Sequence, residues 1–438
     1  MSSYPATYYS ATRVASASAY ENLQTNLQAD VCIVGGGLAG LTTAWELLKR
    51  NKSVIVIEQN KVSWGASGRN GGFCLNGWSE GLGAIEKRSG FEDAKKLFAM
   101  SVEGVDIVRE NIEQNNLPDC NIVKGKLSVV RYEAAEQMQR YRDRMAQHFN
   151  YEYEYLDTTA IRQKLNTPIY KQALRDSTGF HFHPLNYALG LADLIRAKGG
   201  RIFEDSAMQS FTRNTQAGAT GRYTVKTVHG SVRCDDVVLC CGGYGGAQFG
   251  KLRRAFLPIA TYVVLTEKLG NRLRDFIRTT DAVGDDRRSS DYYRVVEGDR
   301  ILWGGRITTK NEQDETRLAA ILRKDMCDVF AGLQDVKIEK AWSGLMGYSR
   351  HKMPHITKVE DGLWTCSSFG GHGMNTTAIG GRVVAEAISG DSDRIRLFEP
   401  YGLTWNGGVF GPLAAETVYS YLRMMDYFQE GRYKGAHR

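Results

Sequence analysis

Hydrophobic and polar positions in the first sixty residues form blocks with different periods. Residues 31–34 are continuously apolar, which is typical of a strand buried on both faces. Residues 41–49 have the apolar spacing of a helix, and a second apolar run over residues 53–57 ends at Glu58. These blocks predict a βαβ unit, in which one helix connects two parallel strands.

The rest of the chain mixes helical patterns with strand patterns. A helix within residues 185–205 is expected to end at Gly199 and Gly200 and to lead into a strand. Other helices are predicted over residues 84–116, 134–147 and 313–332 and from about residue 375. Hairpins are predicted over 121–132 with the turn at Lys124 and Gly125, within 221–243 before a buried strand, and around Glu297 and Gly298 in the strand-rich region 257–308.

These patterns predict an α/β fold with two domains that are discontinuous in sequence. One domain takes the α/β segments from the start, the middle and the end of the chain. The other takes two inserted segments that are rich in antiparallel strand. A chain of 438 residues is long enough for this arrangement.

Composition limits the classes of protein that remain. The longest nearly apolar stretch, residues 255–265, is much shorter than the about 20 residues of a spanning helix, so no membrane association is expected. The N-terminus lacks the apolar core of a secretory signal, although its Ser, Ala and Arg content leaves a transit peptide open. The eight cysteines have neither C-x-x-C nor zinc spacing, which predicts a reduced, cytoplasmic protein without a metal site. A net charge of +7 is mild, and no dense basic stripe suggests a nucleic-acid partner.

A glycine motif lies between the first predicted strand and helix. Gly35, Gly37 and Gly40 have G-x-G-x-x-G spacing, and Glu58 follows the second strand where an acid contacts a ribose in dinucleotide-binding folds. Gly35 permits the tight turn, Gly37 lets a pyrophosphate approach the backbone, and Gly40 allows close packing of helix and strand. The helix N-terminus adds free N–H groups and a partial positive charge. The motif alone leaves NAD, NADP and FAD open.

Four further stretches narrow this choice: "SWGASGRNGG" at 63–72, "VVLCCGGYGG" at 237–246, "WSGLMGYSRHKMPHI" at 342–356 and "SSFGGHGMNTTAIGGRVVAEAI" at 367–388. The first is a flexible loop around one Arg and one Asn. The second is a buried strand that ends in a glycine turn, which in such folds lies near the cofactor. The last contains a second helix N-terminus, which can stabilise negative charge.

Together these stretches resemble the D-amino-acid oxidase superfamily of flavoproteins, in particular bacterial gamma-glutamylputrescine oxidases. The resemblance covers nearly the whole chain and is carried by Tyr8-Tyr9, "GASGRNGG" at 65–72, "HPLN" at 183–186, "DYYR" at 291–294 and "GHG" at 371–373. It implies FAD as the cofactor and oxidation of an amine. No second G-x-G-x-x-G follows, whereas a reductase of the disulfide type needs one for NAD(P)H.

The resemblance also implies a domain layout and a cofactor site. We expect an N-terminal arm (1–28), an FAD-binding domain of the Rossmann type (29–100, 172–250 and 342–395), an inserted antiparallel-sheet substrate domain (101–171 and 251–341) and a C-terminal segment (396–438). The expected cofactor-binding residues are Gly35, Gly37, Leu38, Ala39, Gly40, Glu58, Gln59, Gly65, Ala66, Ser67, Arg69, Asn70, Gly71, Met208, Gly242, Gly371, Gly373, Met374, Asn375 and Thr376.

The mode of FAD attachment follows from the same comparison. Relatives that attach the flavin through Cys resemble this chain around residues 342–347, where no Cys is present. Relatives that use His place it in the loop at 63–72, which has no His. Non-covalent FAD is therefore expected.

The candidate catalytic residues are Tyr292, Arg294 and His372. On a strand, Tyr292 and Arg294 share one face, and Arg294 would bind a substrate carboxylate if that face covers the flavin. The alternative is a solvent-facing Arg, and Trp303 and Arg306 have the same ambiguity. His372 contacts flavin or substrate, or it is a local helix cap. His351 and His355 are expected to be structural.

The predicted reaction oxidises the C–N bond of a small-molecule amine or amino acid to an imine, which hydrolyses, while O2 is reduced to H2O2. The lysine that activates oxygen in sarcosine-oxidising relatives has no counterpart here, because Leu302 lies near that point. A dehydrogenase with another electron acceptor therefore stays open. A tRNA-modifying flavoenzyme is a further alternative, and a flavin-binding module without turnover is another.

Overall fold

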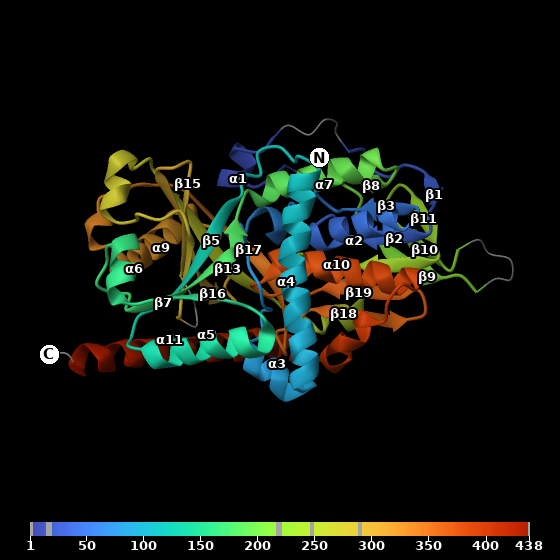
Figure 1. Cartoon of the computed structure of the whole chain (residues 1–438). Coiled ribbons are helices and arrows are strands. Elements are labelled where there is room, and N and C mark those ends of the chain that lie inside the picture. The colour runs from blue at the N-terminus through green and yellow to red at the C-terminus, as the bar shows by residue number, and fades with distance from the viewer. Residues whose placement is uncertain (1–2, 15–19, 216–220, 246–248, 288–290, 437–438) are drawn as a thin grey trace.

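The computed structural model describes residues 3–14, 20–215, 221–245, 249–287 and 291–436. The chain forms two bodies of sheet and helix that share one cavity, and Figure 1 shows them on the right and on the left. This is the α/β fold of a Rossmann-type FAD-binding domain with an inserted antiparallel-sheet domain. None of the described helices is long and apolar enough to cross a membrane.

The first body is built on a six-stranded sheet with the order β18-β19-β12-β2-β3-β8. The neighbours from β19 to β8 are parallel, and β18 pairs antiparallel at the edge. The strands are β2 (Val31–Val34), β3 (Val54–Ile57), β8 (Arg201–Phe203), β12 (Asp236–Leu239), β18 (His355–Glu360) and β19 (Leu363–Ser367). The predicted βαβ unit is therefore present as β2, α2 (Leu38–Lys49) and β3.

Alternate residues of these strands belong to two different cores. Val31 and Ile33 pack with helices α2 and α10 (Gly373–Ser389), whereas Cys32 and Val34 pack with a four-stranded sheet on the other face. That sheet has the order β1-β11-β10-β9, formed by β1 (Asn26–Gln28), β9 (Ser210–Arg213), β10 (Tyr223–Lys226) and β11 (Ser231–Cys234). The central strands are continuously apolar because both of their faces are covered.

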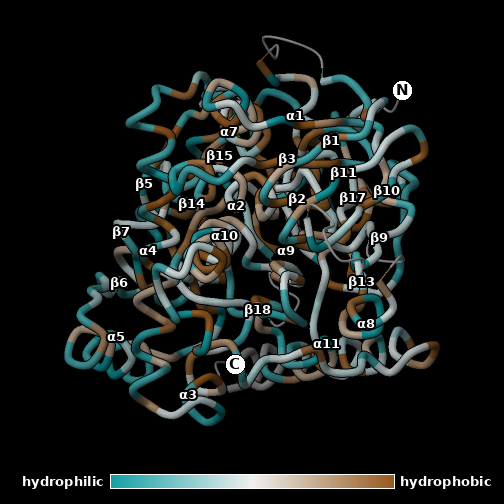
Figure 2. The backbone as a smooth tube through the Cα atoms, turned by 90° about the vertical axis from the view of Figure 1, so that its right-hand side faces the viewer, coloured by the Kyte–Doolittle hydropathy of each residue, from teal (hydrophilic) through white to brown (hydrophobic). Residues whose placement is uncertain are grey.

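Four helices pack side by side on the helical face of this sheet. The long helix α4 (Phe91–Gln114) and α2 both contact α10, and α7 (Pro184–Ala197) contacts α2. Figure 2 shows hydrophobic segments concentrated around α10, β2 and β3 and hydrophilic segments on the peripheral α5 (Ala135–Phe149). The N-terminal ends of α2 and α10 are thus fixed by a large buried core.

The second body is built on a nine-stranded sheet. Its order is β17-β13-β16-β15-β14-β5-β7-β4, and β6 also pairs with β7. The strands are β4 (Phe73–Cys74), β5 (Val123–Val130), β6 (Glu154–Leu156), β7 (Gln172–His181), β13 (Phe256–Thr266), β14 (Ala282–Asp285), β15 (Tyr292–Val296), β16 (Arg300–Thr308) and β17 (Ile338–Ser349). All pairs are antiparallel except β5 with β14.

One face of this sheet is closed by helix α9 (Glu315–Val329), and the opposite face lines the cavity. Tyr293 and Trp303 stack at 4.3 Å in the core beneath α9. Leu127 and Val129 of β5 belong to the same core. Residues one position away from these therefore face the cavity.

Shorter helices complete the two bodies. They are α1 (Tyr8–Ala11), α3 (Leu82–Ser89), α6 (Thr158–Lys164) and α8 (Gly250–Arg253). The C-terminal helix α11 (Gly411–Ala436) is attached to β16 by Glu416, whose carboxylate accepts hydrogen bonds from Thr308 and Thr309.

Two of the expected local structures are wrong. Residues 123–130 form the single strand β5 instead of a hairpin, and Gly125 has a φ of +106° where the pairing with β7 shifts register. The helix expected over 84–116 is broken at Gly90, whose φ of +83° separates α3 from α4.

The domain boundaries stay a proposal. The boundaries at residues 172 and 342 assign β7 and most of β17 to the FAD-binding domain, whereas both strands pair within the nine-stranded sheet. The sheets favour boundaries that follow β7 and β17.

Candidate cofactor and active site

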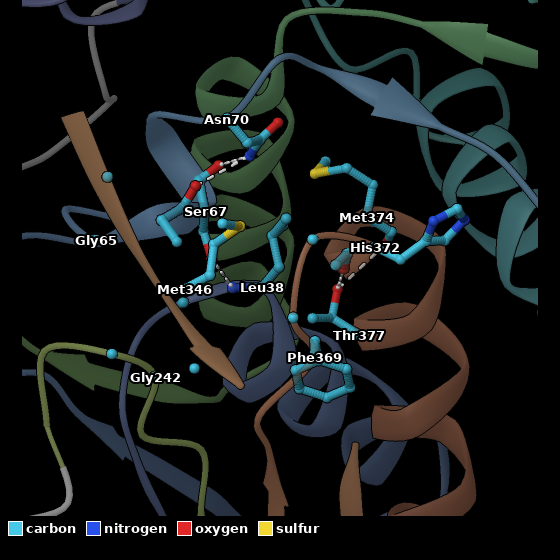
Figure 3. Close-up of a pocket in the computed structure, with 18 of the residues that line it drawn as sticks. Leu38, Gly65, Ser67, Asn70, Gly242, Met346, Phe369, His372, Met374 and Thr377 are labelled. Atoms are coloured by element: carbon cyan, nitrogen blue, oxygen red, sulfur yellow. Dashed lines mark hydrogen bonds between the residues drawn. The ribbon is translucent and has the colours of Figure 1, made fainter. Parts of the chain in front are cut away.

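A cavity of about 630 Å³ lies between the two bodies. Its walls come from the N-termini of α2 and α10, from the loop 63–71, from the ends of β3 and β12, and from one face of the nine-stranded sheet. Figure 3 shows Leu38, Ser67 and Asn70 across the cavity from His372, Met374 and Thr377. Two helix N-termini from opposite ends of the chain therefore meet at one site.

The glycines before α2 form a cradle that side chains would fill. Gly35 has a φ of +113°, and a Cβ there would lie 2.9 Å from the carbonyl oxygen of Cys240. A Cβ on Gly40 would lie 2.0 Å from the oxygen of Gly35. A Cβ on Gly37 would meet only the Ser67 Oγ, at 3.0 Å. Gly35 and Gly40 are thus required by packing, whereas Gly37 keeps the cavity side open.

Glu58 lies beside this cradle at the end of β3. Its Oε2 accepts from the Gly36 N–H at 2.7 Å, and its Oε1 accepts from the Asn60 N–H at 2.9 Å. Burial raises the pKa of Glu58, and these backbone donors oppose the rise. The carboxylate lines the cavity with Gln59, in the position predicted for a ribose contact.

Arg69 is the most informative residue of the loop 63–71. Its guanidinium lies 4.1 Å from the Trp64 ring centroid and 5.0 Å from that of Tyr244. Nε donates to the Trp64 oxygen at 2.8 Å, while the buried Nη2 has no partner within the described structure. An unsatisfied buried donor on a cavity wall fits a ligand that supplies an oxygen or nitrogen acceptor.

The rest of this loop is held by its own hydrogen bonds. The Asn70 amide donates to the oxygens of Ala66 and Ser67, and the Ser67 hydroxyl accepts from the Leu38 N–H at 3.0 Å. Gly65, Ala66, Ser67, Arg69, Asn70 and Gly71 all line the cavity. Met208 and Gly242, predicted from the adjacent segments, also line it.

The N-terminus of α10 places some of its predicted residues in the cavity. Gly371, His372, Gly373 and Met374 line it, whereas Asn375 and Thr376 do not. The Asn375 amide donates to the oxygens of Gly77 and Ser101. The Thr376 hydroxyl donates to the His372 oxygen. Their side chains therefore fix the helix end rather than face a ligand.

His372 is a helix cap as well as a wall residue. Its Nε2 lies 2.7 Å from the Asn76 oxygen, which identifies this nitrogen as the donor. Burial lowers the pKa of His372, and the nearby Lys126 lowers it further. The ring is therefore neutral at physiological pH and anchors the start of α10 to residues 75–76.

Tyr292 faces the cavity from β15 as predicted from strand alternation. Its ring occupies the space that side chains at Gly304 and Gly71 would take, at 2.1 Å and 2.6 Å from the ring atoms. Phe73 packs edge-on against it at 5.4 Å. Burial raises the pKa of Tyr292, so the hydroxyl stays protonated.

Arg294 does not line the cavity, although it shares a strand with Tyr292. Its Nη1 donates to the His181 Nδ1 at 3.0 Å, and its Nη2 donates to the Tyr9 hydroxyl at 3.0 Å. The side chain is 5% exposed. The side chain lies two residues along the strand from Tyr292 and beyond the cavity, so the geometry does not favour a carboxylate clamp at this position.

The other residues with two possible roles prove structural. Trp303 lies in the core beneath α9, and Arg306 forms a bidentate ion pair with Asp325. His355 is fully buried, with its Nδ1 3.0 Å from the Ser368 hydroxyl. His351 is buried near the Gly402 oxygen.

Several cavity residues were not predicted from the sequence. They are Trp64, Leu75, Lys126, Ser128, Tyr244, Asp285, Asp286, Leu345, Met346, Tyr348 and Thr377, among others. Lys126 and Ser128 have the alternation of one cavity-facing strand, a signal that the predicted hairpin concealed. Burial and the neighbouring Asp285 raise the pKa of Asp286 to about 6.

The residues present fit FAD. The glycine cradle and the two helix N-termini suit a dinucleotide, and the unpartnered Arg69 donor on the adjoining wall suits the polar edge of a flavin ring. Cys240 and Cys241 line the cavity near the cradle.

Comparisons with known proteins agree with this reading. Residues 30–387 match the family described as "FAD dependent oxidoreductase". The chain is 33% identical to the protein named "Probable oxidoreductase OrdL" of Haemophilus influenzae, with 92% of this chain and 93% of that protein covered. It is 32% identical to the gamma-glutamylputrescine oxidoreductase of Escherichia coli, with 91% and 92% covered.

Solved structures show the same fold at low identity. Glycine oxidase from Geobacillus kaustophilus superposes with a TM-score of 0.69 at 19% identity, covering 86% of this chain and 99% of that one. L-proline dehydrogenase from P. horikoshii superposes with a TM-score of 0.70 at 18% identity, covering 86% and 98%. With the family match over most of its length, the chain belongs to the FAD dependent oxidoreductase family.

Proposed function

We propose that this enzyme oxidises the C–N bond of a small amine, with a gamma-glutamyl polyamine as its substrate and O2 as its electron acceptor. The observation that carries the proposal is the cavity itself. One side is an FAD cradle, and the other is an aromatic and polar wall without a second dinucleotide motif. The similarity to an enzyme named for gamma-glutamylputrescine supports the choice of substrate.

Bound FAD supplies the oxidising power, because its ring takes up two electrons and a hydrogen from the carbon next to the amine nitrogen. The protein orients the ring and stabilises its added charge. Two positive groups face the cavity on the cradle side. They are the N-terminus of α10 and the unpartnered Nη2 of Arg69. Both are held in place before the reaction, so little reorganisation is needed.

The wall opposite the cradle positions the amine. Tyr292, Phe73 and Tyr348 present rings to the cavity and exclude water from the reacting carbon. The amine must be neutral to react, and a buried site favours the neutral form by desolvation. The Nε2–H of His372 donates to the Asn76 oxygen, which fixes the orientation of the ring.

Water and O2 complete the proposed reaction. The amine loses two hydrogens and becomes an imine, and water converts the imine to an aldehyde and ammonia. O2 takes the two electrons and two protons and leaves as H2O2. Non-covalent attachment of FAD is part of the proposal, since 63–72 contains no His and 342–347 contains no Cys.

A peroxide-coupled assay over polyamines, gamma-glutamyl polyamines, sarcosine, glycine and D-amino acids tests this function. Gamma-glutamylputrescine is expected to give the highest kcat/KM and to bleach the flavin anaerobically, while NADH does not. If amines bleach the flavin but O2 does not restore its colour, the enzyme is a dehydrogenase. Acid precipitation is expected to leave FAD in the supernatant, and colour in the pellet contradicts non-covalent binding.

A further inference from the structure

Lys126 is a lysine on the inner wall of the cavity. It lies on β5, and the adjacent Leu127 points into the opposite core. The register of β5 with β7 shifts between Lys124 and Lys126, at Gly125. A Cβ at Gly125 would lie 1.8 Å from the Asp281 Oδ1, so only glycine fits this break. The break leaves Lys124 exposed while Lys126 lines the cavity.

No carboxylate of the described residues forms an ion pair with Lys126. Its Nζ donates to the Ser128 hydroxyl, and among the described residues the carboxylate of Asp176 acts on it from a distance. Burial lowers the pKa of Lys126 and outweighs the effect of Asp176. Lys126 is half-buried, and an ammonium that is partly withdrawn from water without a counterion is destabilised, so an anionic ligand removes that cost. The site is thus prepared for an anion.

The shape of the wall favours a carboxylate. The Lys126 Cε lies 3.6 Å from the position of a Cβ on Gly284, so the side chain crosses β14 at a glycine and ends beside Ser128. An ammonium and a hydroxyl side by side match the two oxygens of a carboxylate. Asp286, which follows β14, lines the same cavity and suits a head group that also carries an ammonium.

We propose that Lys126, with Ser128, binds the carboxylate at the end of the substrate that does not react. The enzyme then selects amines that carry an amino-acid head group, as a gamma-glutamyl amide does. This inference rests on the proposed amine oxidation and names the residue that selects its substrate. Arg294, which lies outside the cavity, takes no part.

Three substrates separate the charges of the head group. Gamma-glutamylputrescine has a carboxylate and an ammonium, the monoamide of glutarate with putrescine has only the carboxylate, and 4-aminobutanoylputrescine has only the ammonium. Lys126→Met is expected to lower kcat/KM at least 10-fold for the first two, mainly through KM, and less than 2-fold for the third. Lys126→Arg should recover part of the loss, and Lys124→Met, on the same strand but exposed, should change nothing.

Binding provides a readout that is independent of turnover. The butylamide of glutarate carries the carboxylate and no amine, so it binds without reacting. Its flavin difference spectrum is expected to saturate at a concentration at least 10-fold higher in Lys126→Met than in the wild type. Anaerobic flavin reduction measures the same loss without O2.

The proposal is overturned if Lys126→Met loses kcat/KM equally for all three substrates, or if only the reoxidation by O2 becomes slower. Either result makes Lys126 a group for proton transfer or for the reaction with oxygen. If Lys126→Met does not retain FAD, the wild-type enzyme still tests the proposal. Its kcat/KM must be at least 10-fold higher for the two substrates with a carboxylate than for 4-aminobutanoylputrescine. Wild-type flavin that no amine bleaches refutes the proposed function itself. Bleaching without preference for a carboxylate refutes only the role of Lys126.

Discussion

The glycine cradle and the wall around Lys126 face the same cavity, but different parts of the chain hold them. The cradle is local, because Gly35, Gly37 and Gly40 belong to one strand–helix connection. It presents backbone to the cofactor. The wall is assembled from side chains on β5, β14, β15 and β17, which are far apart in sequence.

This difference separates two tasks. A backbone cradle binds any phosphate-bearing cofactor of the right shape and tolerates few changes, since each side chain would clash. A wall of side chains changes its ligand when one residue changes. The comparison therefore predicts that substitutions in the cradle affect cofactor loading, whereas substitutions in the wall affect the choice of substrate.

The largest effect is expected for Gly37→Val in the cradle. Its side chain meets only the flexible Ser67 hydroxyl, so the fold survives, but it occupies the space for a pyrophosphate. FAD occupancy, measured by the ratio of flavin absorbance to protein absorbance, should fall to about zero. Gly83→Val, at a helical glycine with open space around it, is the control and should keep full occupancy. A yellow, fully loaded Gly37→Val protein contradicts our placement of the cofactor.

A smaller effect on the same side is expected for Arg69→Met. The variant loses the unpartnered Nη2 and the stacking on Trp64, but its aliphatic chain still fills the space. The Kd for FAD should rise about 10-fold or more, the order of one charge-assisted hydrogen bond. Arg69→Lys keeps the charge without the planar fork and should recover only part of this. Fluorescence titration of the apoprotein measures both, and an unchanged Kd shows that Arg69 does not contact the cofactor.

The same contrast explains what the sequence was able to predict. The cradle could be placed because its residues are contiguous and their spacing has one physical explanation. Gly65 to Gly71 were assigned to the cofactor site through the resemblance to the flavoprotein superfamily. The wall could be predicted only in part. Strand alternation placed Tyr292 on the face of β15 that lines the cavity. Alternation does not show how far along the strand the cavity extends, and Arg294 lies beyond the end of the cavity.

Lys126 was missed because a local signal was misread. Lys124 and Gly125 suggested a turn, and Gly125 does have a turn-like φ, but the chain continues as a strand on both sides. Pairing with β7 and β14 overrides the local preference. Asn375 and Thr376 were assigned to the cofactor because they begin the last predicted helix, whereas in the folded chain the Asn375 amide donates to the oxygens of Gly77 and Ser101.

A variant of Arg294 tests how far along β15 the substrate-binding wall extends. Arg294→Met removes the donors to His181 and the Tyr9 hydroxyl, two buried groups, and should cost about 1–3 kcal/mol of unfolding free energy. Because Arg294 lies outside the cavity, kcat/KM should change by the same factor for substrates with and without a carboxylate. Thermal unfolding and paired kinetics measure the two effects. A loss restricted to the carboxylate substrate would return the anion site to Arg294 and contradict the role of Lys126.

The last prediction concerns stability rather than function and involves His355, which lies on the cradle side of the molecule. Burial lowers the pKa of His355 to about 3, and its Nε2 has no partner in the described structure. Below the unfolded pKa of about 6.5 the unfolded chain takes up a proton that the folded chain does not, so this histidine destabilises the fold as the pH falls.

The variant His355→Gln removes that uptake while its amide can still reach the Ser368 hydroxyl, which lies 3.0 Å from Nδ1 in the wild type. The slope of unfolding free energy against pH between 6 and 4 should therefore be shallower than in the wild type by about 1.4 kcal/mol per pH unit, the value for one proton. The stability of the variant relative to the wild type then rises as the pH falls. His229→Gln, at an exposed position, should give a curve parallel to the wild type. Parallel curves for His355→Gln as well would show that the acid sensitivity comes from other buried groups, such as His181 on the wall side, whose pKa burial and Arg294 lower to about 3.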